Sequence, residues 1–268
     1  MLAPSPVIKH TAKKALKPRF LQSVAACSVL IFGFFVAELI GTLVSIFADV
    51  LGYLLVSAVL IIFAIAPLFL GVLNYFMRLI WEQNDSVLII FKYFSSKKLY
   101  MRAIKFTLML CLKLVTVSVI FFLPYFIIWL LSNQKLYELL GLSLPVWTSN
   151  LWALNSFVVF ISLLLVCFYM IRYYLSVFIF VANDEIDVAE ALNMSQIISR
   201  RTGGDFTGLL LSFAPWILLS LFVAPLIFTL PYFMASYCVH CRFAITAYNL
   251  DVDQFNSEFT PSFSTDEI

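Results

Sequence analysis

Four ionisable side chains lie inside apolar stretches of this 268-residue chain, where a charge is costly. They are one acid, Glu38, and three bases, Lys113, Arg172 and Arg242. A charge at bilayer depth costs about 3 kcal/mol or more unless it is paired or hydrated, so each is a candidate binding residue. Two interpretations stay open. Glu38 neutralises a cation in a buried network, or the bases reach inner-leaflet phosphates while Glu38 is protonated and hydrogen-bonded to a neighbour.

The second chemical candidate is the Cys238-x-x-Cys241 pair, which encloses His240. Thiol exchange needs a helix N-terminus and solvent to lower the thiol pKa, and this pair lies within an apolar run. A zinc site needs more ligands, and the other histidine of the chain is His10, near the N-terminus. Because phosphate-loop, His-Glu-x-x-His and Gly-x-Ser-x-Gly motifs are also missing, we expect no catalytic residue, metal or cofactor.

Composition indicates where these residues lie. Apolar residues make up 63% of the chain and charged residues 12%, and the mean hydropathy is +1.00. Soluble domains contain roughly 45–50% apolar residues, and a folded domain could not hide the excess. The net charge of +2 excludes a nucleic-acid-binding class. The sequence therefore predicts a polytopic membrane protein with an all-α fold.

Six apolar stretches approach or exceed the ~20 residues that a membrane-spanning helix needs. They are residues 21–47, 51–80, 106–131, 151–181, 206–224 and 227–248. The first two are separated by a tight turn that carries Asp49, whereas 206–248 could instead be one broken segment. Residues 1–20 form a basic segment without a cleavable signal, and the acidic residues 249–268 are expected to be disordered.

Basic residues favour one orientation of this bundle, because positively charged short loops stay in the cytoplasm. They gather in the N-terminal segment, in residues 78–105 and at 200–201, whereas the predicted outer loops hold only Lys135. We therefore predict a multi-pass protein of the cytoplasmic membrane with both termini inside.

Two cytoplasmic segments have amphipathic patterns. Residues 187–201 predict a short interfacial helix in which Asp187 is the N-cap, Glu190 completes a capping box, and Gly203 ends the helix. Residues 88–100 mix aromatic and basic side chains and are expected to contact anionic lipids. The expected partners are thus the bilayer with its anionic inner-leaflet lipids, and other membrane proteins, but not nucleic acid.

The chain also resembles a family of bacterial integral membrane proteins known as domain of unknown function 975. The similarity is most specific at Ser212-Phe213-Ala214-Pro215-Trp216 and at Pro231-Tyr232. It departs from the family pattern at His240-Cys241, where an aromatic pair is usual. The resemblance implies an integral protein of the cytoplasmic membrane and no established activity.

Two classes of function follow. The first is a non-enzymatic accessory or scaffold protein, which the small loops and amphipathic inner segments favour. The alternative is a small transporter or channel for a lipid-like or hydrophobic solute, using the four intramembrane charges. Breaks at Pro67, Gly71, Pro124 and Pro215 could allow helices to unwind around such a site.

Overall fold

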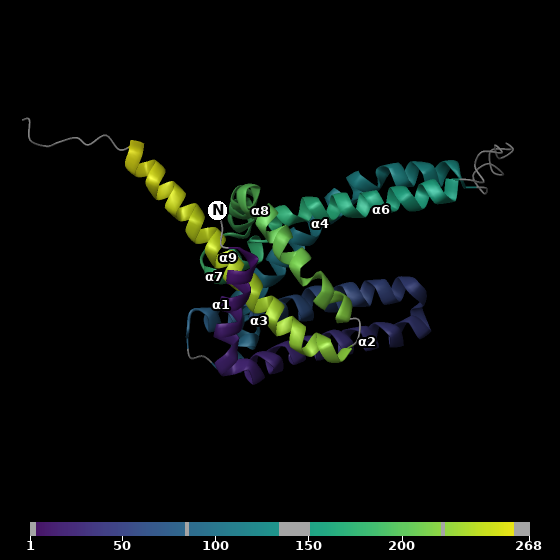
Figure 1. Ribbon diagram of the computed structural model, residues 1–268. Helices are drawn as coiled ribbons and strands as arrows, with labels where there is room; N and C mark the ends of the chain where they lie inside the picture. Colours follow the sequence, from purple (N-terminus) through teal and green to yellow (C-terminus); the bar gives the residue numbers. More distant parts are fainter. Residues whose placement is uncertain (1–3, 84–85, 134–150, 221–222, 260–268) are drawn as a thin grey trace, which may run out of the picture. The chain divides into compact units, whose positions relative to one another are not determined.

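The computed structural model describes residues 4–83, 86–133, 151–220 and 223–259. The regular elements in these ranges are all helices, which confirms the all-α class (Figure 1). The chain forms two compact units. The first comprises Met1–Lys105 with Tyr173–Ile268, the second is Phe106–Arg172, and each is described by itself.

Four described segments are long and apolar enough to cross a membrane. They are Ser5–Phe47, Asp49–Ile80, Lys97–Leu131 and Leu154–Ala182. The regions expected to hold the fifth and sixth spans are also helical, in α8 (Val188–Leu219) and α9 (Val223–Phe259). Within the described residues the structure thus shows a membrane protein with four candidate spans, and the predicted count of six is not confirmed.

The first unit begins with α1 (Ser5–Leu16), which is separated from α2 (Phe20–Leu60) by the short 3-10 helix η1 (Lys17–Arg19). Pro18 lies in η1, and the chain changes direction there (Figure 1). One face of α1 is buried, through Ile8, Ala12 and Leu16. The basic N-terminal segment is therefore a helix that packs on the protein.

The chain reverses direction within α2. Asp49 has a φ of 54°, in the left-handed region that a regular helix does not use, and the two arms run side by side (Figure 1). Gly41 permits this close packing, because a Cβ there would overlap the Ser57 hydroxyl of the returning arm. The structure thus has a turn at the position where the sequence predicts one.

The returning arm contains a π-helical turn, η2 (Ile61–Ile65), just before α3 (Ala66–Ile80). Pro67 explains this irregularity. Proline has no N–H to donate to the carbonyl four residues earlier, which belongs to Phe63. The Tyr100 hydroxyl donates to that carbonyl oxygen at 2.9 Å instead.

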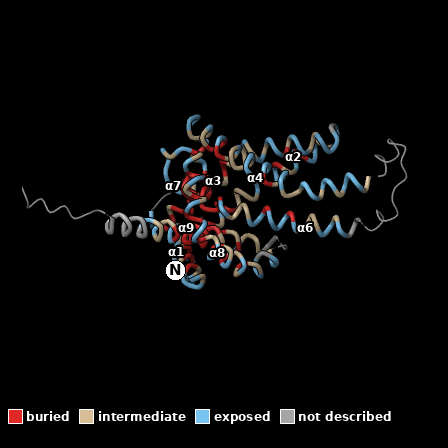
Figure 2. Tube along the Cα trace, turned by 90° about the horizontal axis from the view of Figure 1, so that it is seen from above, coloured by how far each residue is buried: buried red, intermediate tan, exposed pale blue. Residues whose placement is uncertain are grey.

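Helix α3 is the centre of the first unit. Nearly all of its side chains are buried, and Figure 2 shows the buried residues gathered where α1, α3, α7 (Ser176–Ala182) and α9 meet. The 3-10 helix η3 (Val87–Phe94) folds back onto α3 and buries Ile90 and Tyr93. The approach is so close that a Cβ on Gly71 would overlap the backbone carbonyl of Ile90. Residues 88–100 thus have a protein-facing side as well as the exposed basic one.

The prediction that Gly203 ends a short interfacial helix is wrong. Helix α8 continues through Gly203 and Gly204 to Leu219, so the predicted interfacial helix and the start of the fifth span are one element. The reason is a buried stripe whose spacing alternates between three and four residues and crosses the glycine pair without a break. The stripe consists of Leu192, Ser195, Ser199, Thr202, Phe206, Leu209 and Phe213. Packing along the stripe outweighs the ~1 kcal/mol that each glycine costs a helix.

The predicted N-cap of α8 is confirmed. An oxygen of Asp187 accepts a hydrogen bond from the Ala189 N–H at 3.3 Å, and the other accepts one from Lys105 Nζ at 3.1 Å. The Lys105 ammonium, followed by the backbone amides of Val188 and Ala189, holds the pKa of Asp187 below its usual value.

We expect the contribution of Asp187 to stability to depend on pH. Because its pKa is lowered in the folded state, the contribution is present above the usual carboxyl pKa and is lost as the pH falls through the lowered value. The melting temperature of Asp187→Asn should therefore lie below that of the wild type at pH 7, and the gap should shrink on acidification. A gap that stays constant with pH would show that the carboxylate charge plays no part.

Helix α9 runs from Val223 to Phe259, beyond the boundary expected at residue 248. The last part of the predicted tail, residues 260–268, lies outside the described residues.

The second unit is a pair of apolar helices, the larger part of α4 (Lys97–Leu131) with α6 (Leu151–Met170). Between them, the Ser162 hydroxyl donates to the Phe121 carbonyl at 2.8 Å, and the rings of Phe121 and Tyr169 lie 6.4 Å apart. Most of the remaining apolar side chains are exposed, as Figure 2 shows for both helices. Most of the predicted outer loop, at residues 134–150, lies outside the described residues.

Candidate functional site

Glu38 interacts with the returning arm of its own hairpin. Its Oε2 accepts a hydrogen bond of 2.6 Å from the hydroxyl of Tyr53, and the side chain is half-buried between the two arms. A hydrogen bond from Glu38 to a neighbour is one feature of the second interpretation drawn from the sequence. The Tyr53 hydroxyl and the Glu38 carboxyl group thus tie the two arms of the hairpin together.

Arg242 lies at the C-terminal end of α3. Its Nη1 donates to the Ile80 carbonyl at 3.4 Å, and Arg19 Nη1 donates to the nearby Gln83 carbonyl at 2.9 Å. The last carbonyls of a helix lack partners within the helix and carry partial negative charge, so the Arg242 guanidinium stabilises the end of α3, while Arg19 binds the turn that follows it. Arg19, Arg242 and Lys14 line a basic pocket of about 440 Å³.

Lys113 and Arg172 belong to the second unit. Lys113 is exposed on α4, and the guanidinium of Arg172 lies 5.2 Å from the centre of the Tyr169 ring. Of the four charges predicted as binding residues, Glu38 and Arg242 are in the first unit with different partners. Within the first unit, the contacts of Glu38 and Arg242 therefore do not bring these two charges together.

Sequence reasoning missed Arg102, which has the most extensive polar contacts described for any charged side chain. Its Nη2 donates to three carbonyl oxygens around the C-terminal end of α7: Asn183 at 2.6 Å, Ile186 at 3.0 Å and Phe180 at 3.4 Å. The guanidinium also lies 4.1 Å from the centre of the Phe180 ring. The sequence indicates this arginine only as one of several positive charges that set the orientation.

Asp184 joins Arg102 to a second base. It pairs with Lys92 of η3 at 2.7 Å and with Arg102 at 3.6 Å. Lys92, which belongs to the segment expected to contact anionic lipids, forms an ion pair within the protein. The Asn183-Asp184 sequence offers a signal for such a loop, but not for its partners.

A buried polar cluster at the crossing of α8 and α9 was also missed. The hydroxyl of Tyr174 lies 2.8 Å from Thr202 Oγ1 and 3.1 Å from His240 Nε2. Phe206 stacks on the Tyr174 ring, with 4.1 Å between ring centres and 7° between planes. The hydroxyl of Tyr237 donates to the Tyr174 carbonyl. His240 is thus part of a packed polar cluster at the junction of three segments.

Cys238 and Cys241 are both buried and free. In the part of the chain that the structure describes, no three His, Cys, Asp or Glu side chains are grouped so that they could hold a metal ion.

We expect Tyr174→Phe to destabilise the first unit by about 1–3 kcal/mol, because Thr202 and His240 would lose a buried hydrogen-bond partner. Unfolding in a denaturing detergent, followed by tryptophan fluorescence, measures the loss. Tyr125→Phe is the matched control, since that half-buried ring packs on Phe122 through its carbons. Equal stability of the two variants would mean that the cluster contributes only through its rings.

A comparison with known family models gave no match to this chain, and searches of curated proteins and of solved structures gave none either. The resemblance to domain of unknown function 975 therefore stays a prediction.

Proposed function

We propose that this chain is a non-enzymatic accessory or scaffold protein of the cytoplasmic membrane, with both termini in the cytoplasm. The observation that supports the proposal is which groups the charged side chains of the first unit contact. Arg102 and Arg242 bind carbonyl groups at helix ends, Arg19 binds the Gln83 carbonyl beyond α3, and Glu38 accepts a hydrogen bond from a tyrosine hydroxyl. These contacts hold the first unit together rather than line a path for a solute.

The second unit supports the same proposal. Its two helices expose long rows of Phe, Leu and Val, which suit contact with lipid or with the spans of another membrane protein. The exposed residues include Val119, Leu123 and Phe160.

A small transporter is the second candidate, because the first unit has buried polar atoms without a partner in the described structure. They include Asn74 Nδ2, Ser236 Oγ and His240 Nδ1. Such atoms commonly hold water, and a hydrated interior is what a transport path needs.

Flux through liposomes separates the two candidates. We expect vesicles that contain the purified protein to leak protons and small ions no faster than empty vesicles, and Glu38→Gln to behave identically. A protein-dependent flux that Glu38→Gln abolishes would contradict the scaffold proposal.

A positive test uses a photoreactive residue at Phe160, which is 62% exposed, in the native membrane. The scaffold proposal predicts one discrete crosslinked membrane protein. The same probe at Val166, which is 6% exposed within the helix pair, should give none. Crosslinking to lipid alone at Phe160 would count against a docked partner.

A further inference from the structure

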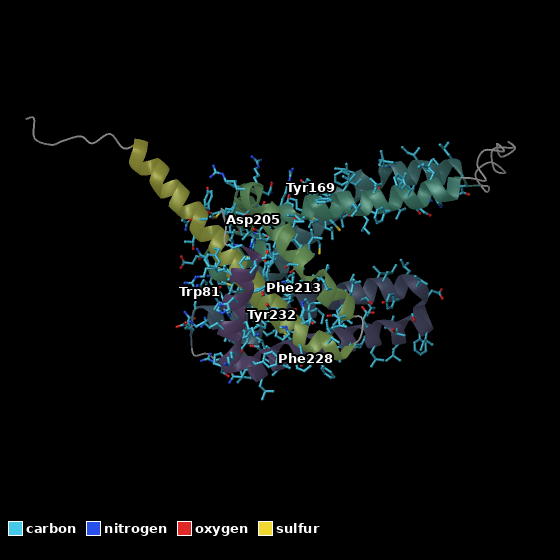
Figure 3. All side chains as sticks on the ribbon, viewed as in Figure 1. Trp81, Tyr169, Asp205, Phe213, Phe228 and Tyr232 are labelled. Carbon is cyan, nitrogen blue, oxygen red and sulfur yellow. The ribbon has the colours of Figure 1, made fainter. Side chains whose placement is uncertain are left out.

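A pocket of about 540 Å³ lies beside the bend between α1 and α2. Three segments line it. Its walls include Lys13, Lys17, Phe20, Trp216, Phe228 and Tyr232. Figure 3 shows Phe228 and Tyr232 on the same helix, α9, below the crossing with α1.

The two lysines form one edge of this pocket. Lys13 in the last turn of α1 and Lys17 at the start of η1 are four residues apart and both line the pocket. Both are exposed, and burial of Ile8, Ala12 and Leu16 fixes the rotation of the helix that carries them. The backbone positions of the two lysines are therefore fixed at one edge of the pocket.

The other two lysines of α1, Lys9 and Lys14, face other parts of the protein. Lys9 donates to the Ser212 carbonyl at 2.9 Å and lies 4.4 Å from the centre of the Phe213 ring. Lys14 lines the separate basic pocket with Arg19 and Arg242. This leaves Lys13 and Lys17 as the pair directed at the apolar pocket.

The rest of the pocket is aromatic. The rings of Phe20 and Phe228 stack with 6.1 Å between centres and 7° between planes. Trp216 is 50% exposed and Phe228 60% exposed. Large apolar side chains next to two ammonium groups match a molecule that is anionic at one end and hydrocarbon at the other.

We propose that this pocket binds one anionic diacyl phospholipid of the inner leaflet. Lys13 and Lys17 hold its phosphate, and an acyl chain lies along Trp216 and Phe228. A free phosphate ion fits the pocket less well, because it would gain no binding energy from the aromatic side chains. Lys13, Lys17 and Phe20 belong to the candidate span Ser5–Phe47. A lipid is therefore the ligand that this part of the protein would meet in a membrane. The proposal goes beyond the scaffold role and does not depend on it.

Native mass spectrometry of the full chain, purified in neutral detergent, tests this site. The probes are phosphatidylglycerol and phosphatidylcholine with identical acyl chains. We expect one tightly bound phosphatidylglycerol per chain, and about 30-fold weaker binding in the double variant Lys13→Gln/Lys17→Gln. The matched control is Lys97→Gln/Lys98→Gln, which removes the same charge from an exposed pair away from the pocket.

Two further measurements test whether the bound molecule is a long-chain lipid. Phe228→Ala should weaken binding of the long-chain lipid, and soluble glycerol phosphate should not compete with it. The proposal is overturned if phosphatidylcholine binds equally well, if glycerol phosphate competes, or if the two lysine pairs have equal effects. Size-exclusion profiles verify that each variant is folded. The lipid-binding results do not change the expected outcome of the flux experiment, so the two proposals can fail separately.

Discussion

Replacing Gly71 by alanine is expected to abolish the native packing of the first unit. A Cβ at this position would overlap the backbone carbonyl of Ile90, and neither α3 nor η3 can move away without exposing the buried side chains between them. Overpacking against backbone rather than against a flexible side chain should cost at least about 3 kcal/mol. Thermal unfolding in detergent, followed by size-exclusion chromatography, measures the effect.

Gly204→Ala is the matched control, since a Cβ there would meet no heavy atom within 4 Å. Gly204 lies inside α8, where alanine is the better helix former, so this variant should gain about 0.5–1 kcal/mol. If Gly71→Ala were as stable as Gly204→Ala, η3 could not lie against α3 as described.

Arg102→Ala is expected to have the second-largest effect. The substitution leaves three carbonyl groups at the end of α7 without their donor and Asp184 with one base instead of two. Hydrogen bonds to a charged group contribute about 1.5–3 kcal/mol each, so a loss of roughly 3 kcal/mol or more is expected. Arg102→Lys should recover only part of it, because an ammonium cannot reach three carbonyls with the planar geometry of guanidinium.

Lys105→Ala provides the comparison one turn along α4. Its ion pair with Asp187 is about 60% exposed on both sides, and exposed pairs contribute little. Equal losses for Arg102→Ala and Lys105→Ala in a denaturant titration would show that the contacts of Arg102 are as weak as a surface ion pair.

Local features of this fold could be predicted from sequence because their causes are local. The turn at Asp49 follows from two apolar runs that meet at one polar residue, and the N-cap at Asp187 follows from a side chain that bonds the next turn. The membrane class follows from composition alone. None of these inferences requires knowing which helices are neighbours.

The features that were missed depend on contacts between distant segments. Gly203 resembles a helix end in the sequence, because the sequence does not show that the stripe of α8 that crosses this glycine is buried. Arg102 resembles any positive charge near a membrane surface until the end of α7 is placed beside it. The same limit applies to Tyr174, because three segments must meet before its hydroxyl has partners.

The central claim is that the apolar helices are surrounded by lipid. A nitroxide at Val119 of α4, which is 61% exposed, tests it in liposomes, in a background with Cys111 and Cys167 replaced by alanine. We predict frequent collisions with oxygen, which concentrates in hydrocarbon, and few with a water-soluble nickel chelate. Frequent collisions with the nickel chelate would place this face in water and contradict the account.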